Sequence, residues 1–298
     1  MRYSQNPILS KKPEMSRPIG KHHKLVLLPH LIKIIPNKPK EPASLPNDAK
    51  FYGFDLDSTL IESKSKMKFS RNPKDWKFVE LVNPESPKEN PVNSLDALLQ
   101  LFKNSSMQSQ QANIVIFSNQ GGVITKPTDS KSCTNLLSKL QNVLEVIEQS
   151  FKEQDCVEFM NHIWIYCSPK MPSSLKKKSS KPNAKTIMVS KKNIFKKQNL
   201  TKEEDIEEIK LPLSQELLFA HMRKPEIGMF EMFQQDMNNY YHLKNGASED
   251  IKLEFYCGDA AGRPTDFSDS DLELANNLQT EFLTPEEFMI RYTDKKSV

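Results

Sequence analysis

The chain has 298 residues, of which 37% are hydrophobic, and a formal net charge of +4. This length allows one large domain or two small ones. No apolar run approaches the roughly 20 residues that span a bilayer, and the N-terminus lacks the apolar stretch of a secretory signal. The four cysteines are widely spaced and form no CxxC pair, which indicates reduced intracellular thiols and argues against a zinc site or a disulfide framework.

Positive charge is concentrated in two segments. Residues 1–50 carry a net charge of +7, and residues 171–202 carry ten lysines and no acid. The rest of the chain therefore carries −13. Basic segments attract polyanions, and nucleic acid is the commonest polyanion in a cell. The alternative is that both segments are solvated stretches that bind nothing.

The prolines and lysines of residues 1–49 predict a basic, disordered tail, because prolines 29, 36, 39, 42 and 46 interrupt any long element. A body of residues 50–298 follows. Within it, the Lys-rich stretch at about 171–215 has no sustained apolar period. We expect this stretch to be a long insertion within one domain.

Strands and helices are predicted to alternate in the body. Short apolar runs of the kind that form buried parallel strands occupy residues 51–56, 114–117, 163–166 and 253–256. Helical spacing of apolar residues is found at 95–102, 134–151, 229–237, 272–278 and 285–290. This alternation predicts an α/β fold with a mainly parallel sheet covered on both faces.

The first predicted strand ends in two aspartates, Asp55 and Asp57. In an open α/β sheet the ligand site lies beyond the carboxyl ends of the strands, and residues i and i+2 leave a strand on the same side. Two carboxylates so close repel each other unless a cation lies between them, and Mg²⁺ prefers such ligands. The alternative is a turn that Asp57 and Ser58 merely cap.

Polar side chains suited to phosphate or metal follow the later strands or precede a helix: Ser118, Asn119, Gln120, Arg223, Lys224, Asp259 and Asp271. Hydroxyl, amide and flexible glycine backbone after residue 117 can donate hydrogen bonds to phosphate oxygens. Taken alone, Arg223 and Lys224 favour an ordinary basic turn. The ordered set favours a phosphate site.

These motifs resemble, in order, those of the haloacid dehalogenase-type phosphatases: DxDxT, a strand-end Ser, a Lys before a helix, and a strand-end GD. Residues 258–263 (GDAAGR) and 266–268 (DFS) further resemble the polynucleotide kinase 3′-phosphatase family. The resemblance covers roughly residues 50–290 and implies a haloacid dehalogenase-like Rossmannoid sheet with only a short cap, a hairpin within residues 63–77. The GxxxxGK[ST] loop of two-function relatives does not occur in this sequence, so a stand-alone, fungal-type 3′-phosphatase without 5′-kinase activity is expected.

The resemblance implies a role for each motif residue. Asp55 is expected to attack phosphorus and form an aspartyl-phosphate, and Asp57 to act as general acid and then base. Ser118 and Lys224 are expected to stabilise the phosphoryl oxygens. Mg²⁺ is expected to be held by Asp55, the backbone carbonyl of Asp57, Asp259 and Asp271. The expected substrate-binding residues are Thr59, Asn119, Gln120, Arg223 and Arg263.

The expected substrate is a 3′-phosphate at a DNA strand-break end, and the expected context is DNA repair in the nucleus. Lysines 176–178 resemble an import signal. DNA ends and other repair proteins are the expected partners, without a membrane or a nucleotide cofactor. Two alternatives stay open: a small-metabolite phosphatase of the same fold, for example one acting on histidinol phosphate, and an inactive nucleic-acid-binding module. Trp76 fits either core packing or contact with a terminal base.

Overall fold

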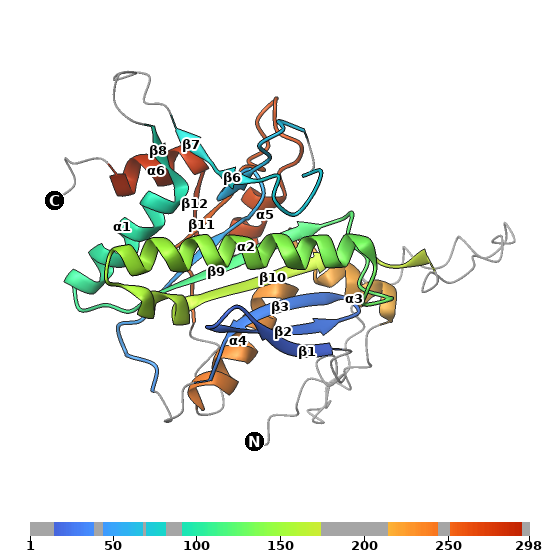
Figure 1. The fold of residues 1–298 in the computed structure, drawn as a ribbon, viewed down its shortest axis with the longest axis horizontal. Helices are drawn as coiled ribbons and strands as arrows, with labels where there is room; N and C mark the ends of the chain where they lie inside the picture. The colour runs from blue at the N-terminus through green and yellow to red at the C-terminus, as the bar shows by residue number, and fades with distance from the viewer. Residues whose placement is uncertain are drawn as a thin grey trace, which may run out of the picture.

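The computed structural model describes residues 15–38, 44–67, 70–81, 91–173, 214–243 and 251–293. These residues form an eight-stranded sheet with helices on both faces, and two short two-stranded ribbons lie beside it (Figure 1). The strand order in the large sheet is β1-β2-β3-β10-β9-β4-β11-β12. Across the described ranges, no helix combines the length and apolar character needed to cross a membrane.

Five parallel strands form one side of this sheet and determine where the site lies. They are β4 (Lys50–Phe54), β9 (Ala112–Gln120), β10 (Ile163–Pro169), β11 (Phe255–Cys257) and β12 (Glu281–Leu283). Because these strands run the same way, their carboxyl ends meet at one edge of the sheet. β4 lies between β9 and β11, so the residues that follow β4 lie in the middle of that edge.

Helices cover both faces of the sheet, as the sequence predicts. One hydrophobic cluster joins the sheet to α1 (Ser94–Met107), α2 (Lys131–Glu153) and α6 (Pro285–Thr293). A second cluster on the other face joins it to α3 (Gln215–His221), α4 (Gly228–Tyr241) and α5 (Ser270–Leu278). In Figure 1, α2 crosses the sheet in front of β9 and β10. A 3₁₀ helix, Val157–His162, leads into β10.

The prediction of a disordered N-terminal tail is wrong for residues 15–36. They form three antiparallel strands, β1 (Met15–Ile19), β2 (His23–Leu28) and β3 (Leu31–Pro36), and β3 pairs with β10. Pro29 lies in the turn between β2 and β3, and Pro36 ends β3. Pro18 lies within β1, which is the edge strand of the sheet, where proline is tolerated. Strands of five or six residues have an ordinary length, so the short stretches between the prolines are long enough to form them.

The cap over the carboxyl edge is short, as predicted. β5 (Ile61–Glu62) pairs with β6 (Lys77–Phe78) to close a hairpin, and β7 (Glu80–Leu81) pairs with β8 (Val92–Asn93). The carboxylate of Asp75 holds the hairpin loop, since it accepts hydrogen bonds from the backbone of Ser65 and from the backbone of Arg71.

Three other sequence predictions bear on the fold. Trp76 is buried in the core with its ring edge-to-face against Phe78, so core packing is the correct alternative. The four cysteines are buried and free. The Lys-rich insertion predicted at about 171–215 lies, for residues 174–213, outside the described residues.

Candidate active site

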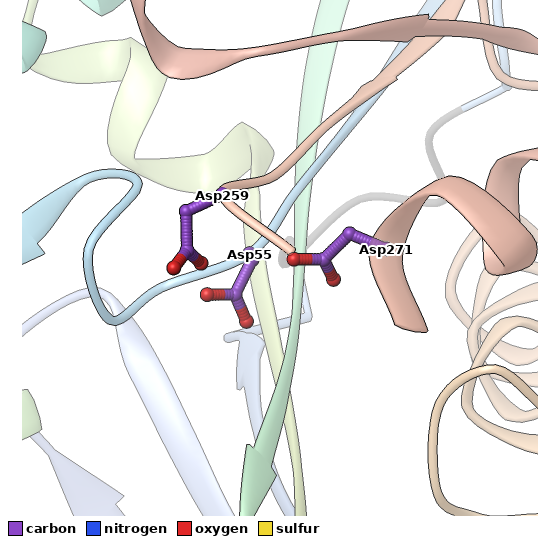
Figure 2. A group of neighbouring side chains, drawn as sticks. All are labelled: Asp55, Asp259 and Asp271. Carbon is purple, nitrogen blue, oxygen red and sulfur yellow. The ribbon is translucent and has the colours of Figure 1, made fainter. Parts of the chain in front are cut away.

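Three carboxylates meet at the carboxyl edge of the sheet. Asp55 follows β4, Asp259 follows β11, and Asp271 lies in the first turn of α5. One oxygen from each lies within 4.8 Å of the others, and Figure 2 shows Asp55 between the other two. The pairing of β4 with β11 brings them together, because the backbone N–H of Asp55 donates to the carbonyl of Cys257 at 2.8 Å.

A glycine is required beside this cluster. A Cβ at Gly258 would lie 2.4 Å from Cγ of Asp271 and 2.5 Å from its Oδ2, which is closer than atoms in contact can approach. The same Oδ2 accepts a hydrogen bond from the backbone N–H of Ala260 at 3.0 Å. The strand-end GDA sequence therefore leaves room for Asp271 and also fixes its orientation.

Lys224 places a positive charge between two of the carboxylates. Its Nζ lies 2.5 Å from Oδ1 of Asp55 and 2.7 Å from Oδ1 of Asp271, and 3.1 Å from the hydroxyl of Tyr256. Burial by itself lowers the pKa of Lys224, but the carboxylates of Asp271 and Asp55 raise it above its ordinary value. The ammonium is therefore charged at physiological pH.

The donor set fits a hard divalent cation. Burial raises the pKa of Asp55 well above its ordinary value despite Lys224, and Asp271 raises it further. Burial and the charge of Asp271 likewise raise the pKa of Asp259 to about 6. One ammonium does not balance three carboxylates of which two are buried and one is half-buried, and an oxygen-only set of this kind suits Mg²⁺.

The carboxylate of Asp57 has partners outside this cluster. Its Oδ1 lies 2.8 Å from Nζ of Lys139 on α2, and its Oδ2 accepts a hydrogen bond from Nε2 of Gln120 at 2.6 Å. Asp57 is absent from the acidic cluster formed by the described residues. Its side chain is 49% exposed, so it stays open to a bound substrate.

The residues at the end of β9 support their neighbours. Ser118 lies within β9, two residues before the strand ends, and its hydroxyl accepts a hydrogen bond from Gln120. The side chain of Asn119 makes two hydrogen bonds to the backbone of Lys224, one to its carbonyl at 3.1 Å and one from its N–H at 3.0 Å. Asn119, predicted to bind substrate, therefore orients Lys224.

The remaining predicted substrate residues differ in exposure. Arg223 is exposed, and its guanidinium lies over Gly121, where a Cβ would be 3.2 Å from Nη2. Arg263 forms an ion pair with Asp266 and donates to the carbonyl of Asp259 at 3.2 Å, so it supports the loop that carries Asp259. Thr59 is fully buried, and its hydroxyl has no hydrogen-bond partner among the described residues.

Two residues of the site were missed by sequence reasoning. The sequence did contain a signal for Lys139, because this charged residue lies on the same side of the predicted helix as the apolar residues Leu136 and Val143. Tyr256 gave no signal, since an aromatic residue in a buried strand is ordinary. Its hydroxyl lies within 3.3 Å of Oδ1 of Asp271 and within 3.3 Å of the carbonyl of Phe117.

The sheet order and the carboxylates at its carboxyl edge define the haloacid dehalogenase-like Rossmannoid class predicted from the sequence. The profile of the polynucleotide kinase 3 phosphatase family matches residues 50–289. The chain therefore belongs to this family, and the predicted enzyme class, a phosphomonoester hydrolase, is confirmed.

Individual relatives agree with this assignment. The chain is 37% identical over 269 residues to a polynucleotide 3′-phosphatase of Saccharomyces cerevisiae, an alignment that covers 89% of this chain and 98% of the relative. It is 36% identical over 267 residues to a polynucleotide 3′-phosphatase of Saccharomyces mikatae, covering 89% and 95%. A bifunctional polynucleotide phosphatase/kinase of Schizosaccharomyces pombe is 26% identical over 244 residues, covering 82% of this chain but 38% of the relative.

Proposed function

We propose that the chain is a Mg²⁺-dependent polynucleotide 3′-phosphatase that removes 3′-phosphate from DNA strand-break ends and acts in DNA repair. The observation that carries the proposal is the cluster of Asp55, Asp259 and Asp271, with Lys224 against its two buried members. The choice of a polynucleotide follows from the two Saccharomyces relatives, each named a polynucleotide 3′-phosphatase and each matched over nearly its whole length.

In the first step, a carboxylate oxygen of Asp55 bonds to phosphorus while the bond from phosphorus to the 3′-oxygen breaks. Asp57 gives its proton to the departing 3′-oxygen, which leaves as the DNA hydroxyl. The phosphoryl group is then an aspartyl-phosphate. Asp57 next takes a proton from water, whose oxygen bonds to phosphorus, and inorganic phosphate and the free carboxylate of Asp55 are released.

Positive charge must offset the charge that develops on the phosphoryl group. When bound by Asp55, Asp259 and Asp271, Mg²⁺ supplies much of this charge. Lys224 adds a fixed ammonium beside the nucleophile. The hydroxyl of Ser118 accepts a hydrogen bond from Gln120, so its own proton remains available to a phosphoryl oxygen.

Recognition of the DNA strand is assigned to the exposed rim of the site. Arg223 precedes Lys224 in the chain and is exposed, so its guanidinium is available to the phosphodiester next to the 3′-phosphate. Nuclear residence belongs to the same proposal and follows from the Lys-rich segment at residues 171–202.

Phosphate release from matched substrates tests the proposal. The purified chain with Mg²⁺ should release phosphate from a 3′-phosphorylated oligonucleotide and leave the 5′-phosphorylated form and histidinol phosphate intact. A chelator should abolish the reaction, and excess Mg²⁺ should restore it. Equal rates on the two oligonucleotides would refute the specificity, and full activity in chelator would refute the metal dependence. Asp55→Asn is the control for a contaminating phosphatase.

A further inference from the structure

Lys139 is a buried charge that the apolar face of α2 does not explain. It lies at helical spacing from Leu136 and Val143, both buried, and is itself only 7% exposed. A lysine on such a face ordinarily extends its ammonium into water. Here Nζ instead lies 2.8 Å from Oδ1 of Asp57.

The second oxygen of Asp57 is held separately. Nε2 of Gln120 donates to Oδ2 at 2.6 Å and to the hydroxyl of Ser118 at 2.8 Å. The terminal torsion of an aspartate is normally broad. With one oxygen held from α2 and the other from the end of β9, the carboxylate of Asp57 cannot turn without breaking one of these contacts.

We propose that Lys139 is a positioning residue that fixes the carboxylate of Asp57 for proton transfer to and from the reacting oxygens. The inference rests on the proposed function, because that function gives Asp57 its role. Stability does not explain the pair: burying a charge costs free energy, and an apolar side chain of similar volume often serves a fold as well or better. The orientation of Asp57 does explain it.

Two substrates with different leaving groups separate this role from a purely structural one. The 3′-oxygen of a phosphorylated oligonucleotide needs a proton as it leaves, whereas the phenolate of 2,4-dinitrophenyl phosphate does not. Steady-state kcat and KM would be measured on both substrates for wild type, Lys139→Met, Asp57→Asn and the double variant. Methionine keeps the length and apolar stem of lysine and removes only the ammonium.

We expect Lys139→Met to lower kcat/KM on the oligonucleotide by roughly ten- to a hundredfold, less than the roughly 10²–10⁴-fold expected from losing the acid itself. On dinitrophenyl phosphate kcat/KM should be unchanged, while kcat falls because water activation also needs Asp57. A burst of dinitrophenolate should therefore appear. In the Asp57→Asn background, Lys139→Met should have no further effect.

Three results would overturn the inference: an equal loss of kcat/KM on both substrates, which assigns Lys139 to phosphoryl binding; no loss on either; or losses that multiply in the double variant. Lys152→Met, on the same helix and paired with Glu148, is the matched control and should behave as wild type. If wild type hydrolyses only the aryl ester, the proposed DNA substrate fails, but kcat on that ester still tests Lys139.

Discussion

At the scale of single residues, the site holds two buried carboxylates close to each other. Asp55 and Asp271 are 6% and 1% exposed, and the only ammonium contacting them within the described part of the chain is that of Lys224. The pKa of Asp55 is raised by burial and by Asp271, so the ionised nucleophile depends on positive charge in the site. Bringing these carboxylates together in a buried place also costs folding free energy, because like charges repel each other.

Asp55→Asn should abolish phosphate release, because an amide does not attack phosphorus as a carboxylate does. The fold should be retained, since asparagine has nearly the same volume and can still meet Nζ of Lys224. Phosphate release and the thermal midpoint measured on the same sample check this. Residual activity that survives repurification and remains sensitive to chelator would contradict the assignment of the nucleophile.

Ser58 holds an unfavourable backbone conformation directly after the catalytic motif. Its φ is 65°, in the left-handed region that costs residues other than glycine on the order of 1–2 kcal/mol. Ser58→Gly should therefore keep activity and leave the free energy of unfolding equal or higher, and Ser58→Val should lower it by more than about 1 kcal/mol. Urea denaturation would measure both.

The control for Ser58 is a serine in ordinary helical conformation. Ser138 is exposed within α2, and Ser138→Gly should lower stability by roughly 0.5–1 kcal/mol. If Ser58→Gly destabilises the protein as much as Ser138→Gly does, the left-handed backbone at residue 58 is not the cause of strain.

At the scale of elements, the parallel core was predictable and the added strands were not. Strands β4, β9, β10 and β11 are continuous apolar runs, and α2 repeats its apolar residues at helical spacing, so local pattern alone identifies them. Strands β2 and β3 carry equally apolar runs. Taken alone, these runs allow local structure, and the surrounding prolines argue against a longer element, but prolines at strand ends are compatible with a short meander.

The site residues that belong to a sequence motif could be predicted, whereas the contacts that depend on the packing of separate elements could not. The three carboxylates and Lys224 come from strand ends and helix starts that the sequence pattern identifies. The bond from Asn119 to the backbone of Lys224 and the pairing of Lys139 with Asp57 depend on how separate elements pack, and no spacing along the chain encodes that.

The N-terminal strands are attached through a histidine that should respond to acid. His23 on β2 is 1% exposed, and its Nε2 contacts the carbonyl of Ile163, the first residue of β10, at 3.0 Å. Burial lowers the pKa of His23 to about 4. The unfolded chain then binds more protons between the ordinary histidine pKa and 4, so stability is lost as pH falls through this range.

His23→Gln should reduce this loss, because glutamine can donate to the same carbonyl without titrating. The difference in unfolding free energy between the variant and wild type should shift in favour of the variant by roughly 2 kcal/mol from pH 7.5 to pH 5. Urea denaturation at the two pH values would measure it. His242, which is exposed after α4, gives a matched His→Gln control. An identical pH dependence of the unfolding free energy in wild type and both variants would show that His23 does not cause the loss of stability in acid.

At the scale of the whole molecule, the positive charge of the two basic segments of the sequence has to be considered separately. Part of the charge in residues 1–50 is neutralised within the fold, since Lys33 is paired with Asp236 and Lys50 with Glu254. Residues 171–202, with ten lysines and no acid, lie almost wholly outside the described residues. They remain the candidate for long-range attraction to DNA.

Replacing residues 171–202 with a neutral Gly/Ser sequence of equal length tests that attraction while keeping the chain continuous. Hydrolysis of a small aryl phosphate should be unchanged, because the segment contains no acidic residue and the carboxylate cluster consists of Asp55, Asp259 and Asp271. Affinity for a 3′-phosphorylated duplex should fall on the order of tenfold or more at physiological salt, and the dependence of log affinity on log salt should flatten, since fewer counterions are released.

Binding titrations at several salt concentrations with the Asp55→Asn form, which cannot consume the substrate, would measure both. An unchanged affinity and salt slope would identify the segment as a passive linker and leave DNA attraction to the exposed arginines of the site.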